Sequence, residues 1–197
     1  MSTDAHHALL PQDAGIVLLP LARVAIAQEI GRALPAPEER PWLREPGACF
    51  ITLIYEARLR GCIGTLEAHR ALGEDVRANA VAAAFRDPRF KPLTADEFDG
   101  IEVEISLLSA LEPLVCADEN EVLGLLRPGV DGIIFHYGHH KSTFLPQVWS
   151  DFAYAADFMA HLKYKAGLPP DFWDPQVKLY RYTVTKWRES ELCALMP

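Results

Sequence analysis

The sequence contains few cysteines, no long apolar run and no excess of positive charge. Its four cysteines are Cys49, Cys62, Cys116 and Cys193. They are widely spaced and form no Cys-x-x-Cys pair, which argues against a zinc ribbon. The apolar run of residues 14–22 is too short to cross a bilayer, and no Lys or Arg precedes Arg23 to form the basic region of a signal peptide. We therefore expect a cytoplasmic protein with reduced thiols and no membrane partner.

Acidic residues outnumber basic residues in this chain. Nineteen Lys and Arg against twenty-seven Asp and Glu give a formal net charge of −8 at pH 7. This balance argues against a nucleic-acid partner. The Gly-x-Gly-x-x-Gly, Walker A, Gly-x-Ser-x-Gly and His-Glu-x-x-His motifs are also missing, so nucleotide-dependent and standard hydrolase functions lose their usual support. At 197 residues the chain is long enough to bury a core, as one domain or two small lobes.

The most distinctive stretch of the sequence is Leu-Arg-Gly-Cys-Ile-Gly-Thr at residues 59–65. It follows the β-branched and aromatic run of residues 50–55 across the short polar connection of residues 56–58, and this pattern predicts a β-hairpin. Because side chains alternate along a strand, we expect Arg60 and Cys62 on one face of the return strand. The opposite face is expected to carry Leu59, Ile63 and Thr65.

Cys62 is a candidate reactive thiol. Two residues along a strand span about 6.6 Å, which is close enough for the Arg60 guanidinium to favour a thiolate where water is partly excluded. Gly61 and Gly64 have no side chains, so a ligand can approach the backbone on either side of the thiol. The alternative is that Cys62 is a small buried hydrophobic residue and that the glycines only relieve crowding at a bend.

Periodic patterns elsewhere predict further helices and strands. The expected helices are residues 19–34, 72–86, 118–126 and 150–166, with a short helical turn at residues 94–100. The expected strands after the hairpin are residues 101–107, 132–137, 142–145 and 177–187. Pro20 is expected in the first turn of the first helix, and Gly167 at the C-cap of the last. Without a regular βαβ repeat, this order predicts an α+β fold, a largely antiparallel sheet with flanking helices.

Two pairs of charged residues are candidates for a site. Glu102 and Glu104 share one strand face, where they form either a functional carboxylate pair or an ordinary solvated face. Arg89 could reach an anionic group near Cys62. The alternative, which we favour, is that Asp87 and Arg89 brace the turn around Pro88 with hydrogen bonds.

Three histidines lie close together at residues 136, 139 and 140. Imidazole is a common metal ligand, but a strand position and two turn positions do not converge on one point. We favour a solvated turn, and we predict no metal site here.

Several segments of the chain, in order, resemble the motifs of one known family. They are Leu59–Gly64, Asp87–Phe90, Val103–Leu108, Gly129–Ile133, Leu145–Val148, Lys165–Pro170 and Lys178–Tyr180. On these segments the chain resembles the AMMECR-one domain family over about residues 15–187, and in particular its bacterial members called AmmeMemoRadiSam system protein A. The resemblance implies a larger lobe from both chain ends, a smaller middle lobe and a cleft between them. We accordingly expect a loosely ordered N-terminus (1–14), the family domain (15–187) and a C-terminal tail (188–197).

The family carries no established reaction, and two hypotheses stay open. In the first, the cleft binds a small molecule or a peptide segment, with Cys62 and Arg60 as the catalytic candidates and Cys62 acting as nucleophile or acid/base. The resemblance implies that a Memo-like protein and a radical SAM enzyme supply or receive the substrate. In the second, the chain is a non-catalytic accessory module that docks those partners. The candidate binding residues are Gly61, Gly64, Thr65, Arg89, Glu102 and Glu104.

Overall fold

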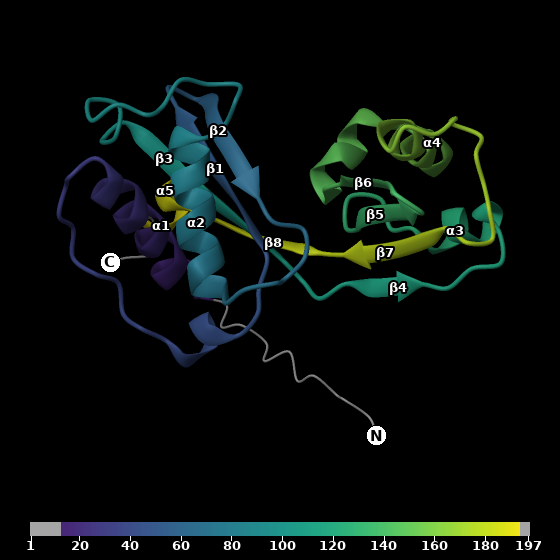
Figure 1. Cartoon of the computed structure of the whole chain (residues 1–197), viewed down its shortest axis with the longest axis horizontal. Coiled ribbons are helices and arrows are strands. Elements are labelled where there is room, and N and C mark those ends of the chain that lie inside the picture. Colours follow the sequence, from purple (N-terminus) through teal and green to yellow (C-terminus); the bar gives the residue numbers. More distant parts are fainter. Residues whose placement is uncertain (1–12, 194–197) are drawn as a thin grey trace. The chain divides into compact units, whose positions relative to one another are not determined.

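The computed structural model describes residues 13–193, and within them the chain forms two compact units (Figure 1). The first unit includes the chain up to Leu108 and the chain from Thr185 onward, and the second consists of Ser109–Val184. Each unit contains one antiparallel sheet of four strands together with helices. The predicted α+β class is therefore confirmed. The expectation of a loosely ordered N-terminus falls mainly on residues 1–12, which lie outside the described residues.

The first unit is built on a sheet with the strand order β2–β1–β3–β8. These strands are β1 (Cys49–Tyr55), β2 (Arg58–Gly64), β3 (Ile101–Leu108) and β8 (Val184–Arg188). Helices α1 (Gly15–Glu29) and α2 (Leu72–Phe85) pack side by side against one face of this sheet (Figure 1). The short helices η1 (Pro41–Arg44) and α5 (Glu189–Cys193) complete the unit.

Alternating side chains give this sheet an inner face toward α1 and α2 and an opposite outer face. The inner positions of β1 and β3 are buried: Cys49, Ile51, Leu53, Ile101, Val103, Ile105 and Leu107. They pack against the predicted inner face of α2, which is Leu72, Val76, Ala80 and Ala84. The outer positions are Phe50, Thr52 and Ile54 of β1, paired with Ser106, Glu104 and Glu102 of β3. The core of the unit thus lies on one side of the sheet, and most of the polar strand residues lie on the other.

Helix α1 begins earlier than the sequence predicts. It starts at Gly15, so Pro20 lies inside the helix and not in its first turn. Pro20 has no amide hydrogen, so the helix lacks one backbone hydrogen bond there. Because Pro20 is exposed, water can bond to the unpaired carbonyl instead. The helix ends at Glu29, before the expected residue 34, because Gly31 takes the left-handed conformation with φ of 73°. None of the helices in residues 13–193 is long and apolar enough to span a bilayer.

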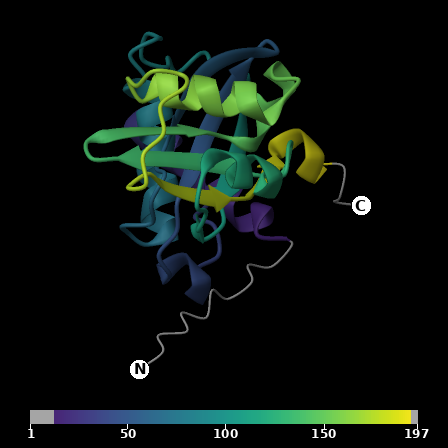
Figure 2. The same ribbon diagram turned by 90° about the vertical axis from the view of Figure 1, so that its right-hand side faces the viewer.

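The second unit is built on a sheet with the strand order β4–β7–β5–β6. The strands are β4 (Glu112–Leu114), β5 (Gly132–Tyr137), β6 (His140–Phe144) and β7 (Lys178–Tyr182). The helices are α3 (Glu119–Leu125), η2 (Pro146–Asp151) and α4 (Ala155–Lys165). Helix α4 lies alongside β6, where the Ser142 hydroxyl donates to the Leu162 carbonyl (Figure 2). The helix expected to start at residue 118 is α3, and Asp118 is its N-cap, since its side chain accepts from the Glu121 amide.

Two predictions in the C-terminal half are wrong in detail. The helix expected at residues 150–166 begins only at Ala155, because the preceding residues form η2, which the Trp149 indole fixes by donating to the Asp131 carbonyl. The strand expected at residues 177–187 is two strands, β7 and β8, which belong to different sheets. The side-chain alternation runs on through Thr183, so it does not reveal the change of partner. Residues 188–193, expected in a tail, lie in the end of β8 and in α5.

Candidate functional site

The β1–β2 hairpin positions the candidate thiol, and it contains two irregularities. Its turn is formed by Glu56 and Ala57, which both have positive φ, 49° and 60°. Within β2 the register shifts between the pairs Leu53–Gly61 and Ile54–Leu59, so Arg60 is an extra residue in a β-bulge. A hairpin was predicted here and is confirmed, but the bulge was not predicted.

The bulge changes which residues of β2 share a face. Leu59 pairs with outer residue Ile54 and is 45% exposed, so it lies on the outer face and does not share a face with Ile63, although alternation predicted that it would. Cys62 pairs with outer residue Thr52, which places the thiol on the outer face. Ile63 packs against the inner core, as the alternation predicts. The bulge therefore interrupts the alternation of side chains, which is regular only from Gly61 onward.

The two glycines beside the thiol are close to other parts of the same unit. A Cβ atom on Gly61 would lie 2.1 Å from the carbonyl oxygen of Ala83 in α2. A Cβ atom on Gly64 would lie 2.2 Å from the ring of Phe50. We expected a ligand to approach the backbone at these glycines, but the space beside them is filled by Ala83 and Phe50 of the protein itself. This agrees with the alternative, in which the glycines only relieve crowding.

Hydrogen bonds to side chains hold the backbone of Cys62 in place. Its thiol is partly exposed and accepts a hydrogen bond from the Thr52 hydroxyl at 3.4 Å. Its amide donates to Asp87 Oδ2 at 2.8 Å, and its carbonyl accepts from Arg89 Nη2 at 3.1 Å. Arg89 also holds Asp87 through two side-chain hydrogen bonds of 2.9 and 2.7 Å. The bracing role that we favoured for Asp87 and Arg89 is thus confirmed, and it extends to the strand that carries Cys62.

The guanidinium of Arg60 does not contact the thiol in the way that alternation predicts. Its Nε and Nη2 atoms donate to the two carboxylate oxygens of Glu97 at 2.9 and 3.0 Å, and Nη2 also donates to the Pro92 carbonyl. The hydrogen bond from Arg60 lowers the pKa of Glu97 to about 2. Because Arg60 is the bulged residue, its side chain reaches the segment after α2 and is already neutralised there. Its Nη1 atom is buried without a hydrogen-bond partner among the described residues.

Arg89 is the cation that lies beside Cys62. Its pKa is raised, first by its hydrogen bond with Asp87 and to a smaller degree by the neighbouring Cys62. The same hydrogen bond holds the pKa of Asp87 well below its ordinary value. We expected Arg60 to supply a positive charge next to Cys62. Arg89, one of the candidate binding residues, supplies it instead.

Glu102 and Glu104 both lie on the outer face of β3, where alternation places them, but each has its own partners. Glu104 is 5% exposed and forms ion pairs with Lys186 and Arg188 of β8. Glu102 accepts from the amide and the hydroxyl of Ser190. Because Glu104 is paired with two cations and Glu102 with Ser190, the two carboxylates do not share a partner among the described residues.

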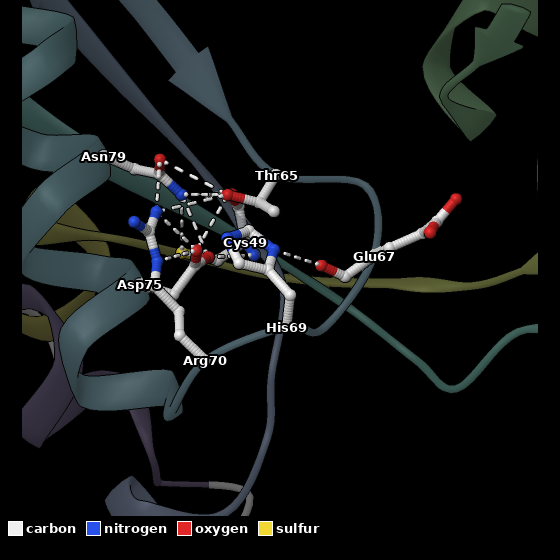
Figure 3. Close-up of polar contacts among 7 residues, drawn as sticks. All are labelled: Cys49, Thr65, Glu67, His69, Arg70, Asp75 and Asn79. Carbon is white, nitrogen blue, oxygen red and sulfur yellow. Dashed lines mark hydrogen bonds and ion pairs between the residues drawn. The ribbon is translucent and has the colours of Figure 1, made fainter. Parts of the chain in front are cut away.

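Thr65 belongs to a buried polar network on the inner side of the sheet, not to the surroundings of Cys62 (Figure 3). At its centre is Asp75 of α2, which is fully buried and accepts from the amide and thiol of Cys49, the hydroxyl of Thr65 and the Nε atom of Arg70. Asn79, one helical turn later, donates to Asp75 and to the Cys49 carbonyl. The network joins the start of β1, the end of β2 and α2.

The described cysteines differ in their surroundings. Burial, with the nearby charge of Asp75, raises the pKa of Cys49 well above its ordinary value. Burial also raises the pKa of Cys116, and the carboxylates of Glu121 and Asp118 add to the shift. Neither thiol is therefore suited to act as a nucleophile. Cys62 has no carboxylate hydrogen-bonded to its sulfur in the described residues, and it has Arg89 nearby.

The histidines of the second unit do not converge on a common point. His136 and His140 each contact a backbone carbonyl, of Gly138 and Ala166 respectively. The His139 and His140 rings lie 4.1 Å apart, centroid to centroid. Among residues 13–193 no group of three or more His, Cys, Asp or Glu side chains is arranged to hold a metal ion.

Three side chains that organise the site were not singled out from the sequence as site residues. Asp75 and Asn79 are spaced i, i+4 beside the apolar stripe of α2, and this spacing was a signal that two polar residues point into the core. Glu97 was expected to cap a short helix, and it does accept from the Thr94 amide at 2.9 Å. Its stronger contact, with Arg60, links positions far apart in the sequence, and no local pattern reveals it.

The fold and the site define a protein of two α+β units in which a polar sheet face carries a single, backbone-braced thiol. The family model described as AMMECR1 matches residues 19–187. A protein of Methanothermobacter thermautotrophicus is 37% identical over 189 residues, which cover 93% of this chain and 98% of that protein. Protein MJ0810 of Methanocaldococcus jannaschii is 36% identical and covers 93% of this chain and 94% of its own length. The crystal structure of the uncharacterized protein PH0010 from Pyrococcus horikoshii superposes with a TM-score of 0.76 at 32% identity, over 90% of this chain and 92% of that chain.

The chain belongs to the AMMECR1 family. The resemblance that the ordered motifs indicated is thereby confirmed at the level of the family. The relatives carry names that state no activity, so what the chain does is argued from its site.

Proposed function

We propose that the outer face of the first sheet around Cys62 binds a small molecule or a peptide segment, and that the Cys62 thiol is the reactive group of this site. The proposal rests on one observation above all, namely that Cys62 is partly exposed while its backbone is held on both sides by Asp87 and Arg89. A fixed backbone presents the thiol in one position, which is what a reacting group requires. Arg89, which donates to the Cys62 carbonyl and is about half exposed, lies where it can bind an anionic group of a ligand beside the thiol.

A second candidate function is favoured by a different observation. Both charged side chains associated with the motif, Arg60 and Arg89, are engaged in bracing contacts within the first unit. Under this second function, the Arg-Gly-Cys-Ile-Gly motif serves to stabilise the fold and performs no chemistry. The chain is then a non-catalytic module that docks other proteins. The partners that we propose under either function are a Memo-like protein and a radical SAM enzyme, which follow from the resemblance to AmmeMemoRadiSam system protein A.

Alkylation of the native protein distinguishes the two functions. Iodoacetamide should modify Cys62 faster than Cys116, because burial and the carboxylates of Glu121 and Asp118 raise the pKa of Cys116 and so lower its thiolate fraction. Peptide mass spectrometry after timed quenching measures the rate at each cysteine separately. Cys116 is the matched control, since it is also partly exposed but lies beside carboxylates. Equal and slow rates at Cys62 and Cys116 would support the docking module and reject the reactive thiol.

A substitution separates a role in function from a role in stability. Cys62→Ala should abolish the activity of the chain in vivo while lowering the free energy of unfolding by no more than about 1–2 kcal/mol. Binding of purified Memo-like and radical SAM proteins should be unchanged in this variant if the thiol acts on a substrate. If the variant keeps full activity in vivo, the thiol is not the reactive group.

A further inference from the structure

Strand β2 is an edge strand of the first sheet, since the order β2–β1–β3–β8 leaves one of its sides without a neighbouring strand. An edge strand offers unpaired amides and carbonyls to any extended chain, including a second copy of the same protein. The charged residues of β2, Arg58 and Arg60, lie at its start, so the stretch from Gly61 to Gly64 has no charged side chain of its own to protect it. The exposed side of β2 therefore needs another form of cover.

The hydrogen bonds of Cys62 supply this cover. In an antiparallel pair, alternate residues direct their amide and carbonyl away from the partner strand. At Cys62 both of these groups are occupied by side chains, the amide by Asp87 at 2.8 Å and the carbonyl by Arg89 at 3.1 Å. A carboxylate oxygen stands where the carbonyl of a next strand would accept, and a guanidinium N–H stands where its amide would donate.

The Asp87–Arg89 pair that occupies these groups is itself fixed in position. The Asp87 side chain is 1% exposed, and two hydrogen bonds of 2.9 and 2.7 Å join it to Arg89 as an ion pair. Two residues earlier along β2 the bulge at Arg60 interrupts the regular edge, and Arg60 ties down the same segment through Glu97. Bulges and charged side chains are the usual means by which proteins block strand addition.

We propose that the Asp87–Arg89 pair takes the place of a fifth strand at the edge of β2 and prevents strand addition there by a second copy of this chain. The occupant that is excluded is a second copy because each molecule carries the same edge, and two such edges can pair about a twofold axis. This role does not depend on whether the thiol of Cys62 reacts with a substrate.

The proposal is tested by measuring the mass of the protein in solution after the Asp87–Arg89 pair is removed. The double variant Asp87→Ala/Arg89→Ala removes both charges together and leaves neither buried alone. Light scattering after size exclusion should show a mass that rises with concentration, to at least twice that of the wild type measured beside it. Arg86→Ala is the matched control, because it removes an exposed charge from the same segment and should keep the wild-type mass.

A third variant shows where any new association occurs. Adding Cys62→Pro to the double variant removes the amide that faces the open edge, a position where proline is tolerated in an edge strand. This triple variant should return to the wild-type mass. An associated double variant that is unchanged by Cys62→Pro would overturn the proposal, because the contact would then lie elsewhere.

Circular dichroism establishes that each variant is folded. If the double variant is unfolded, Arg89→Ala alone replaces it, since that side chain is 53% exposed and its loss is milder. In this variant the Asp87 carboxylate, which accepts from the residue 62 amide, loses the guanidinium that holds it, so this amide should exchange with deuterium faster than in the wild type. Folded variants that keep both the wild-type mass and the wild-type exchange rate would refute the role of the pair.

Discussion

Gly61 separates Arg60 from Cys62, and replacing it with alanine tests why a glycine stands there. The new Cβ atom would lie 2.1 Å from the carbonyl oxygen of Ala83, and ordinary contact between such atoms is about 3.5 Å. Helix α2 would therefore have to retreat from β2 by more than about 1 Å. Its buried face includes Asp75 and Asn79, whose hydrogen bonds would be stretched by that movement.

The cost of Gly61→Ala follows from two opposing terms. Replacing glycine by alanine restricts the unfolded chain and favours folding by about 0.4–1 kcal/mol. Forcing an extra carbon into a packed core costs about 1–3 kcal/mol, and more where the obstructing atom is backbone that cannot rotate away. Because the obstructing atom here is backbone, the cost lies at or above the upper end of that range, and we expect a net loss of about 2 kcal/mol or more in the free energy of unfolding.

Urea unfolding followed by circular dichroism measures this loss, and Gly124→Ala is the matched control. Gly124 lies in α3 with no heavy atom near the position of a Cβ atom, so alanine there should stabilise the helix by up to about 1 kcal/mol. The two substitutions add the same methyl group and should have opposite signs. If Gly61→Ala is as stable as the wild type, α2 does not pack on β2 as closely as described and the reasoning fails.

Further predictions concern the turn, the acid range and the buried network. Glu56→Asn with Ala57→Gly should raise the free energy of unfolding by about 0.5–1 kcal/mol, because both positions have positive φ; a decrease in urea unfolding would contradict this. The pKa values of Asp87 and Glu97 are lowered in the folded state, so the stability that they contribute is complete above about pH 5 and is lost as the pH falls through the folded values, near 2 for Glu97. Unfolding measured between pH 5 and 2 should therefore show a shallower decline in Glu97→Gln than in the wild type, and parallel curves would refute this linkage. Asp75→Asn should lower the free energy of unfolding by about 2–4 kcal/mol, since buried donors lose their acceptor; a loss below 1 kcal/mol by thermal and urea unfolding would contradict the central role of Asp75.

Local patterns predicted the local structure well. The alternation of β3, the start of α3 at Asp118 and the left-handed Gly167 after α4, with φ of 80°, all depend on residues close in sequence, and each is found where it was expected. The hairpin was also predicted, although its turn uses Glu56 and Ala57 and none of the usual glycine or asparagine residues.

The candidate site was less predictable, because its geometry depends on contacts between distant residues. An alternation rule assumes a regular strand, and the extra residue at Arg60 breaks it, so the expected Arg60–Cys62 pairing is replaced by the contact of Cys62 with Arg89. The Arg60–Glu97 ion pair spans 37 positions and leaves no periodic signal. Thr65 lies on the face opposite the thiol, as alternation predicts, but its contact with Asp75 was not predicted.

The chain leaves the second unit after Val184. Just before this point, the amide and the carbonyl of Thr183 are both bonded to Ser109, the residue at which the chain first enters that unit. Entry and exit therefore meet at one point, and residues 109–184 form an insert between neighbouring strands β3 and β8. A domain can be inserted in this way without breaking the host sheet, because its two ends lie close together. A chain in which a tight turn joins Leu108 directly to Thr185 would retain every strand of the first sheet except the opening residue of β8, together with the thiol and its braces.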